Sequence, residues 1–320
     1  MNAIEYIQQH IQSLDWKREP RGLYEPIEYA LQSGGKRLRP ALAVIASDLF
    51  DGCRDDVLPA ALALEVFHNF TLLHDDVMDN APIRRGRPTV HIRWNENTAI
   101  LSGDQMLIEA YKLLSEVKPQ YLPQVISLFN KMATEICEGQ QYDVDFEHRD
   151  DVSRDDYLMM IRLKTSVLLA TALQIGALIA GADNDAQLSL YNYGINIGLA
   201  FQLQDDILDV YGDPATFGKA IGGDILCAKK TYLLLTALLK ADAEQKKQLM
   251  QLLADKTLPD QHKIQSVTAL YNQLGVRQIC EEVMNNYTML ALAELDKINA
   301  PEEKKLILIN LAQKLLARKE

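Results

Sequence analysis

Residues 58–79 read LPAALALEVFHNFTLLHDDVMD, and this stretch decides the fold. It repeats apolar residues at helical spacing and ends in Asp75, Asp76 and Asp79, in the pattern Asp-Asp-x-x-Asp. Because residues four apart share a helix face, a helix here puts the carboxylates of Asp75 and Asp79 next to each other. Carboxylates this close repel each other unless a cation compensates them, and hard oxygen ligands of this kind suit Mg²⁺.

A second copy of this pattern ends another mostly apolar run, at Asp205, Asp206 and Asp209. Two such clusters, together with several metal ions, make a site for a diphosphate. The similar framing of the two clusters hints at an old duplication, although the sequence between them shows no clear repeat.

One stripe of the first predicted helix is polar. Glu65, His68, Leu72, Asp75 and Asp79 follow steps of three or four residues and therefore share a face. The neighbouring stripe is largely apolar, so we expect this helix to lie inside the protein. A buried polar stripe must line a wet cavity or a metal site, because burying polar groups without partners is costly.

Helical periodicity extends over nearly the whole chain. Apolar residues recur at helical spacing in the segments 41–50, 58–73, 99–114, 121–136, 157–180, 188–203, 230–239, 246–253, 264–274 and 279–298. No sustained alternation predicts a sheet, and the breaks between segments are short. We therefore predict one all-α domain that covers residues 1–320.

Composition excludes several classes of protein. The chain has 320 residues and a net charge of -11, which argues against general nucleic-acid binding. Its four cysteines form no Cys-x-x-Cys pair, so we expect reduced thiols, no zinc site and a cytoplasmic location. Residues 1–16 do not resemble a signal peptide. The apolar run 167–182 is short for a membrane span and contains Gln174, so we predict a buried helix and no stable membrane insertion.

The first basic motif is GGKRLRP at 34–40, which supplies Lys36, Arg37 and Arg39. Its two glycines let the backbone approach an anion closely. Pro40 is well placed to begin a helix, whose N-terminus favours negative charge. The motif therefore predicts a cradle for a diphosphate, and the alternative is a solvated basic turn.

A second basic motif, RRGRP at 84–88, closely follows the first acidic cluster. The guanidinium groups of Arg84 and Arg85 can fork onto a phosphate, and the alternative is a surface patch of salt bridges. Further along, Lys164 and Thr165 interrupt an apolar helical stretch. A buried lysine needs a counter-anion, whereas a lysine at the surface needs none.

Two weaker signals complete the set. Gln140 lies in the polar segment EGQQ at 138–141, and taken alone it is more typical of a surface residue than of a site. The segment 212–231 is rich in glycine and contains Lys219, Asp224 and Lys229. It is typical of a lid over a charged ligand, and the alternative is a plain surface loop.

The order of these motifs is far more specific than any one of them. They read GGKRLRP, then a histidine before Asp-Asp-x-x-Asp and Arg-Arg-Gly, then Lys-Thr, then Gln-x-x-Asp-Asp-x-x-Asp and Gly-Lys-x-x-Gly-Gly-Asp. In this order the chain resembles the trans-isoprenyl diphosphate synthases, or polyprenyl synthetases, from about Tyr29 to Thr231. The resemblance implies an all-α bundle around a deep cavity, usually a homodimer, with about three Mg²⁺ ions as cofactor.

The resemblance also implies head-to-tail prenyl transfer between isopentenyl diphosphate and an allylic diphosphate. The allylic substrate loses diphosphate to give an allylic cation, the double bond of isopentenyl diphosphate attacks the cation, and a proton is lost. The sequence offers no strong protein base, so we expect the departing diphosphate to take the proton. A closed cavity would keep out water, which would otherwise convert the cation to an alcohol.

Residues that match the motifs take their expected roles from the resemblance. The direct Mg²⁺ ligands are Asp75, Asp79 and Asp205, and the further ligands or their supports are Asp76, Asp206 and Asp209. The cations expected on the leaving diphosphate are Arg84, Lys164, Lys219 and Lys229. Those expected to bind isopentenyl diphosphate are Lys36, Arg37, Arg39, His68 and Arg85. The oxygen dipoles expected to turn towards the carbocation are those of Thr165 and Gln202.

Product length depends in this family on bulky side chains upstream of the first acidic cluster. Phe70 lies five residues before Asp75 and Thr71 lies four before it. An aromatic residue there resembles the floor of a short-chain enzyme, which makes farnesyl or geranylgeranyl diphosphate. A helical wheel, however, places Thr71 below Asp75 and Phe70 to the side.

Four alternatives remain open from the sequence. The first is a longer-chain synthase with a hexa- to octaprenyl product. The second is a non-catalytic partner subunit, which usually lacks one of the acidic clusters, whereas this chain keeps both. The third is a terpene cyclase, which has no use for a second diphosphate site. The fourth is a di-iron bundle, for which the chain offers a single Glu-x-x-His pair, at Glu65 and His68.

Overall fold

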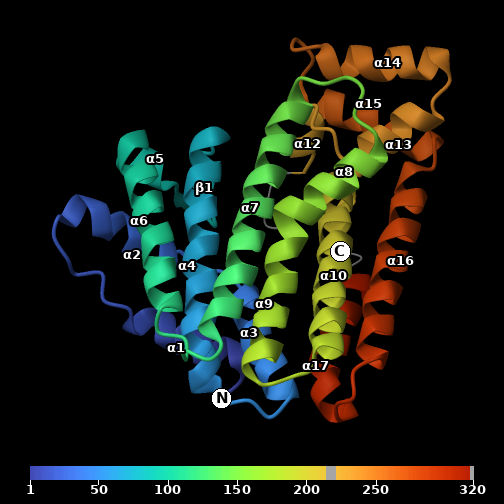
Figure 1. Ribbon diagram of the computed structural model, residues 1–320. Helices are drawn as coiled ribbons and strands as arrows, with labels where there is room; N and C mark the ends of the chain where they lie inside the picture. Colours follow the sequence, from blue (N-terminus) through green and yellow to red (C-terminus); the bar gives the residue numbers. More distant parts are fainter. Residues whose placement is uncertain (214–220, 318–320) are drawn as a thin grey trace. The chain divides into compact units, whose positions relative to one another are not determined.

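The computed structural model describes residues 1–213 and 221–317, without the side chains of 315–317. The predicted all-α class is confirmed (Figure 1). Within the described ranges the only strands are β1 (Ile83–Arg84) and β2 (Arg87–Pro88), which pair antiparallel in a short hairpin.

The helices follow the predicted periodic segments closely. The first group is α1 (Ala3–Ser13), α2 (Arg21–Gln32), α3 (Leu38–Leu49), α4 (Arg54–Met78), α5 (Val90–Arg93), α6 (Glu96–Leu114) and α7 (Leu122–Glu147). The second group is α8 (Arg154–Ile161), a π-helical turn (Arg162–Ser166), α9 (Val167–Ile179), α10 (Asn184–Tyr211) and α12 (Gly223–Leu226). The last group is α13 (Tyr232–Lys240), α14 (Ala243–Ala254), α15 (Asp260–Gln273), α16 (Val276–Asp296) and α17 (Glu302–Ala317).

Contacts divide the chain into two compact units. The first contains residues 1–130 and 171–190, and the second contains 131–170 and 191–320. The helices α7, α9 and α10 each contribute residues to both units. That residues 1–320 form a single domain stays a prediction.

Helix α4 lies at the centre of the first unit, where it packs against α6 and α3 (Figure 1). Every residue from Ala60 to Asn69 is buried, so this part of α4 is covered on all sides, as predicted. Burying a side chain as large as that of Phe67 contributes about 1.5–3 kcal/mol to stability. Elsewhere in the unit, a Cβ on Gly176 of α9 would lie 2.0 Å from the carbonyl oxygen of Ala43, so this close approach requires glycine.

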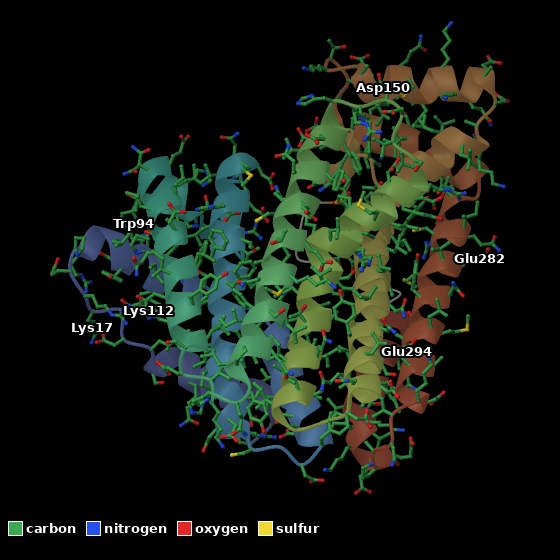
Figure 2. All side chains as sticks on the ribbon, in the orientation of Figure 1. Lys17, Trp94, Lys112, Asp150, Glu282 and Glu294 are labelled. Atoms are coloured by element: carbon green, nitrogen blue, oxygen red, sulfur yellow. The ribbon has the colours of Figure 1, made fainter. Side chains whose placement is uncertain are left out.

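The second unit has its own apolar core, built by α8, α10, α13, α15 and α16. The packing of α16 follows from its sequence. Its buried residues recur every three or four positions, from Val276 through Cys280 and Met284 to Leu295. The charged side chain of Glu282 lies on the exposed face of the same helix (Figure 2). The helix is therefore amphipathic, with one stripe towards the core.

Two helical segments are long and apolar enough to cross a membrane, Arg54–Met78 and Arg154–Ile179. Most of each apolar window is buried inside the protein, 61% and 67% respectively, as is usual for core helices. The absence of stable membrane insertion and the cytoplasmic location stay predictions.

Candidate active site

The first acidic cluster lies at the C-terminal end of α4. Asp75 is in the last turn and half-buried, and Asp79 is the exposed residue at the end of the helix. The N–H of Asp79 donates to the carbonyl oxygen of Asp75 at 2.8 Å, so the helical register continues and the two side chains share a face as predicted. The helix dipole adds negative potential at this end, which increases the attraction for a cation.

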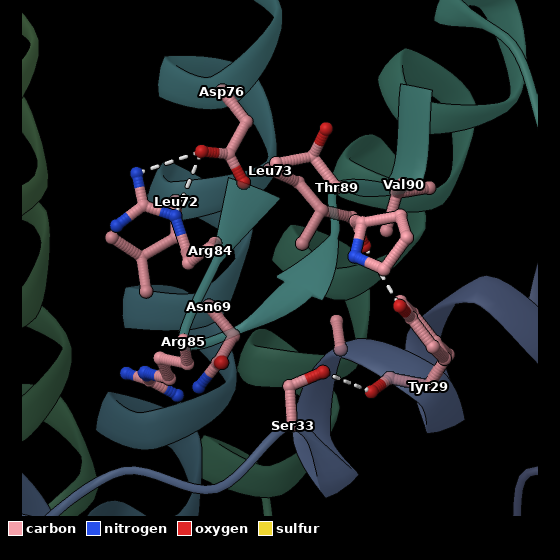
Figure 3. A pocket seen from close by; sticks show the side chains of 12 residues that line it. Tyr29, Ser33, Asn69, Leu72, Leu73, Asp76, Arg84, Arg85, Thr89 and Val90 are labelled. Atoms are coloured by element: carbon pink, nitrogen blue, oxygen red, sulfur yellow. Dashed lines mark hydrogen bonds and ion pairs between the residues drawn. The ribbon is translucent and has the colours of Figure 1, made fainter. Parts of the chain in front are cut away.

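Asp76 has a different role from its two neighbours. It is 4% exposed, and its Oδ1 accepts from Nε and from Nη2 of Arg84 at 2.7 Å each (Figure 3). Burial raises the pKa of Asp76, although the charge of Arg84 acts in the opposite direction. Asp76 therefore orients the guanidinium group of Arg84. The sequence had predicted that Asp76 is a further metal ligand or a support for one.

The hairpin β1–β2 joins the two basic motifs. Its turn is Arg85-Gly86, both with positive φ, at 53° and 73°. The guanidinium group of Arg85 donates to the carbonyl oxygen of Gly34. A Cβ on Gly35 would lie 2.7 Å from Nη1 at the flexible end of Arg85, and the φ of 120° at Gly35 is a conformation that favours glycine. A small pocket, open to solvent, lies next to this hairpin and α2 (Figure 3).

His68 lies among the arginines of these motifs. It is 8% exposed, and burial together with the charges of Arg39, Arg85, Arg84 and Arg37 holds its pKa well below 6.5. The imidazole is therefore neutral at physiological pH. Several guanidinium groups around a neutral histidine leave an excess of positive charge that an anion can neutralise.

Arg37 differs from its expected role as a substrate ligand. It is 3% exposed and begins α3 with a left-handed φ of 47°. Its Nη1 lies 2.5 Å from Oε1 of Glu65, its Nε donates to Gln8 at 3.2 Å, and Nη2 donates to the carbonyl oxygen of Leu31. The left-handed turn points this side chain into the first unit, while Lys36 is exposed. We therefore assign Arg37 to positioning the loop.

Glu65 is thus the counter-ion of Arg37. Because its carboxylate is paired with Arg37, Glu65 is not available as a ligand of the di-iron site that the Glu-x-x-His pair suggested. Among the described residues, no group of three or more His, Cys, Asp or Glu side chains could hold a metal ion.

The second acidic cluster lies near the end of α10. Asp205 and Asp209 are half-buried, and Asp206 is 3% exposed. Burial and the charge of Asp224 raise the pKa of Asp206 to about 7, against the effect of its hydrogen bonds. Oδ2 of Asp209 accepts from the N–H of Asp224 at 3.0 Å, in the first turn of α12.

Lys164 lies in the π-helical turn between α8 and α9, close to a carboxylate that the sequence did not indicate. Nζ of Lys164 is 2.6 Å from Oδ2 of Asp143 on α7, and Nζ of Lys229 is 3.8 Å from the same oxygen. Burial raises the pKa of Asp143, but the charges of Lys229 and Lys164 outweigh it, so the pKa lies below its ordinary value. The side chain of Lys164 is 24% exposed, so it is half-buried, and Asp143 is its counter-anion.

Two glycines make room for the π-helical turn. A Cβ on Gly139 of α7 would lie 2.4 Å from the backbone nitrogen of Lys164, and a Cβ on Gly198 of α10 would lie 2.6 Å from Oγ of Ser166. The neighbouring helices thus come into backbone contact with the turn. In the same region the hydroxyl of Thr165 donates to Oε1 of Gln202 at 3.4 Å, so these two predicted residues lie together.

The remaining predicted residues are placed as follows. Phe70 is half-buried on α4, and its ring centroid lies 5.4 Å from that of Phe67 and 4.8 Å from that of His74. The hydroxyl of Thr71 donates to the carbonyl oxygen of His68 at 2.8 Å. Lys219 lies outside the described residues.

Comparison with known proteins gives consistent results. A family model described as polyprenyl synthetase matches residues 20–273. Geranylgeranyl diphosphate synthase of Methanosarcina mazei is 42% identical over 238 residues, which is 74% of each chain. A short chain isoprenyl diphosphate synthase of Methanocaldococcus jannaschii is 40% identical over 249 residues, 78% of this chain and 76% of the relative. A crystal structure of a geranylgeranyl pyrophosphate synthase superimposes with a TM-score of 0.93, at 44% identity and over 100% of both chains.

Proposed function

The chain belongs to the polyprenyl synthetase family, and from this we propose that it joins isopentenyl diphosphate to an allylic diphosphate to form a trans-prenyl diphosphate of geranylgeranyl length. The family predicted from the motifs is confirmed, as is its enzymatic class, isoprenyl diphosphate synthase. The predicted fold is confirmed as well, because the structural relative shares it along its whole length.

The observation that carries the proposal is the cationic cluster around His68. In the first unit, the charges of Arg39 and Arg85 act on a neutral imidazole, and the contact between Arg85 and Gly34 ties the two basic motifs together. A single diphosphate would neutralise this cluster through charge-assisted hydrogen bonds. A cyclase that ionises one diphosphate needs no second cluster, and the second unit contains its own lysines at Asp143.

The carboxylates of the two acidic clusters fit Mg²⁺, because they offer oxygen ligands at helix positions four residues apart. Asp75, Asp79 and Asp205 would hold the ions, and about three ions are proposed from the family. When bound, Mg²⁺ supplies Lewis-acid charge that stabilises the departing diphosphate.

Residues of the second unit assist cleavage of the allylic carbon–oxygen bond. The bonding electrons leave with the diphosphate, and the ammonium groups of Lys164 and Lys229 neutralise its growing charge. Asp143 holds Lys164 in place at 2.6 Å before substrate binds. The oxygens of Thr165 and Gln202 then stabilise the allylic cation, which the double bond of isopentenyl diphosphate attacks. The proton lost from the resulting cation goes to the diphosphate.

Product length is proposed from Phe70 and from the relatives. The ring of Phe70 packs between those of Phe67 and His74, and Phe67 in turn contacts Phe129 at a centroid distance of 5.1 Å. Such an aromatic group resists displacement by a growing prenyl chain because interiors are closely packed. We therefore propose geranylgeranyl diphosphate as the main product, with farnesyl diphosphate and longer products as the alternatives.

A homodimer is proposed from the exposed face of α6. Ile100, Leu101, Ile108 and Tyr111 are 42%, 59%, 54% and 38% exposed, which leaves an apolar stripe on a helix of the first unit. A stripe of this kind is typical of a protein–protein interface. Sedimentation equilibrium of the wild type should give twice the monomer mass, and Ile108→Glu should shift the protein towards the monomer. A wild-type monomer would contradict this.

The direct test of the function uses purified protein, Mg²⁺, labelled isopentenyl diphosphate and each allylic primer in turn. We expect label in geranylgeranyl diphosphate, and none when a chelator is in excess. Product made from the allylic substrate alone, without incorporation of isopentenyl diphosphate, would show a cyclase and contradict the proposal.

A further inference from the structure

Four polar side chains of the second unit form a continuous chain of hydrogen bonds. The hydroxyl of Tyr157 on α8 donates to Oδ2 of Asp206 at 2.5 Å. Nε2 of Gln202 donates to Oδ1 of the same carboxylate at 3.3 Å. The hydroxyl of Thr165, in the π-helical turn, donates to Oε1 of Gln202 at 3.4 Å. These hydrogen bonds therefore link α8 to Gln202 and Thr165, the residues proposed to stabilise the cation.

Asp206 is enclosed by protein, in contrast to the other two carboxylates of its cluster. It is 3% exposed, Tyr157 is 2% exposed, and each carboxylate oxygen of Asp206 accepts from a protein donor. Asp205 and Asp209 are both half-buried. A carboxylate with both oxygens in hydrogen bonds has its direction fixed, so Asp206 is suited to orienting its partners.

These hydrogen bonds determine which end of the Gln202 amide faces Asp206 and which end faces Thr165. An amide has an acceptor at Oε1 and a donor at Nε2, and rotation by half a turn exchanges them. Because Tyr157 donates to Oδ2 of Asp206 at 2.5 Å, Oδ1 is left to accept from Nε2 of Gln202 at 3.3 Å, and Oε1 stays on the side of Thr165. With the amide reversed, the positive end of its dipole would face a carbocation, and this raises the barrier to ionisation.

We propose that Tyr157 is a positioning residue that holds Asp206 and through it keeps Oε1 of the Gln202 amide turned towards the allylic cation. The inference rests on the proposed function, because it concerns the cation of that reaction. Tyr157 lies on the buried face of α8 and touches no substrate in this account. Its hydroxyl acts on the rate of ionisation and leaves the affinity for either diphosphate unchanged.

The first test is Tyr157→Phe, with Tyr193→Phe as matched control. Tyr193 is fully buried in the same unit, and its hydroxyl donates to the carbonyl oxygen of Leu308 at 2.8 Å, so both variants lose one buried hydroxyl. We expect Tyr157→Phe to lower kcat by about ten- to a hundredfold, the range for a buried acceptor that loses its hydrogen-bond partner, with both KM values within about twofold. Tyr193→Phe should lower the melting temperature without this loss of kcat.

The second test is a double-mutant cycle in a Gln202→Leu background, where the amide is absent. If Tyr157 acts through this amide, Tyr157→Phe should have no further effect on kcat in that background. The fraction of allylic substrate released as alcohol should also rise in Tyr157→Phe. A poorly stabilised cation reacts less efficiently with isopentenyl diphosphate. Water then attacks the cation instead, and the adduct loses a proton to give the alcohol. Asp206→Asn gives a second variant that interrupts the chain and should lower kcat similarly.

Three results would overturn the inference. One is that Tyr157→Phe has the same kcat as an active wild type. Another is a loss of kcat as large in the Gln202→Leu background as in the wild type. The third is recovery of kcat in Tyr157→Phe at raised Mg²⁺, which would place the effect on metal binding. If the wild type shows no prenyl transfer, the proposed function is contradicted. The wild type is assayed before the variants, so this outcome is distinguished from a failure of the inference about Tyr157.

Discussion

Replacing Arg37 by methionine should separate a positioning role from a binding role. The side chains of Arg37 and Glu65 are 1% and 3% exposed and lie 2.5 Å apart, so Arg37→Met leaves Glu65 as a buried carboxylate. Asn69 remains as a donor to Glu65 at 3.0 Å, but it carries no charge. Removing one partner of a buried ion pair costs about 3–5 kcal/mol. We expect a loss of unfolding free energy in this range.

Urea unfolding followed by circular dichroism measures this loss, and two variants serve as comparisons. Replacing both partners, Arg37→Met with Glu65→Leu, should restore most of the stability, because apolar side chains of similar size often replace a buried ion pair at little cost. Lys36→Met, in the same loop but exposed, should leave stability nearly unchanged and raise the KM for isopentenyl diphosphate. If Arg37→Met instead raises this KM and is as stable as Lys36→Met, Arg37 is a direct ligand and the assignment is wrong.

Three further predictions concern metal, pH and product. Asp75→Ala or Asp205→Ala should lower turnover by several orders of magnitude, since each removes an expected Mg²⁺ ligand; near-normal steady-state rates would refute this. Burial and the nearby arginines hold the pKa of His68 below 6.5, so the unfolded chain takes up a proton that the folded chain does not, and stability falls as pH drops below that value. His68→Gln should reduce this decline between about pH 7.5 and 5.5 in urea unfolding, and an equal decline in both proteins would contradict it. Phe70→Ala should lengthen the products, because each added CH₂ gains about 0.8 kcal/mol of burial, and an unchanged chain length by mass spectrometry would show that Phe70 is not the floor.

Much of the fold could be predicted from the sequence because helical periodicity reports burial directly. The apolar positions of α4 repeat at helical spacing up to Asp75, and the helix ends at Met78. The same pattern predicted that Asp75 and Asp79 share a face. It could not predict the π-helical turn at Lys164, which depends on the close approach of Gly139 and Gly198 from other helices.

The partners of single side chains were beyond the sequence for a similar reason. Arg37 reads like Lys36 and Arg39, and only the left-handed backbone at Arg37 directs it to Glu65. Asp143 is one acidic residue among several near the end of α7, and its role follows from two lysines that are distant in sequence. The polar Gln140 one turn earlier was the only signal nearby.

The structure also adds residues to the site that no motif contained. Tyr157 follows the pattern of a core tyrosine, and its hydrogen bond to Asp206 joins positions 49 apart in sequence. A buried tyrosine needs a partner for its hydroxyl, but the sequence cannot say which one. Contacts between distant segments thus decide the details of the site, whereas local patterns decide the helices.

We propose that two separate groups of cations bind two different diphosphates, and steady-state kinetics test this most directly. The KM for each substrate and kcat should be determined side by side for Arg39→Ala, His68→Ala and Lys164→Ala. We expect the first two changes mainly to raise the KM for isopentenyl diphosphate, whereas Lys164→Ala should mainly lower kcat through slower ionisation of the allylic substrate. The same kinetic profile in all three variants would contradict it.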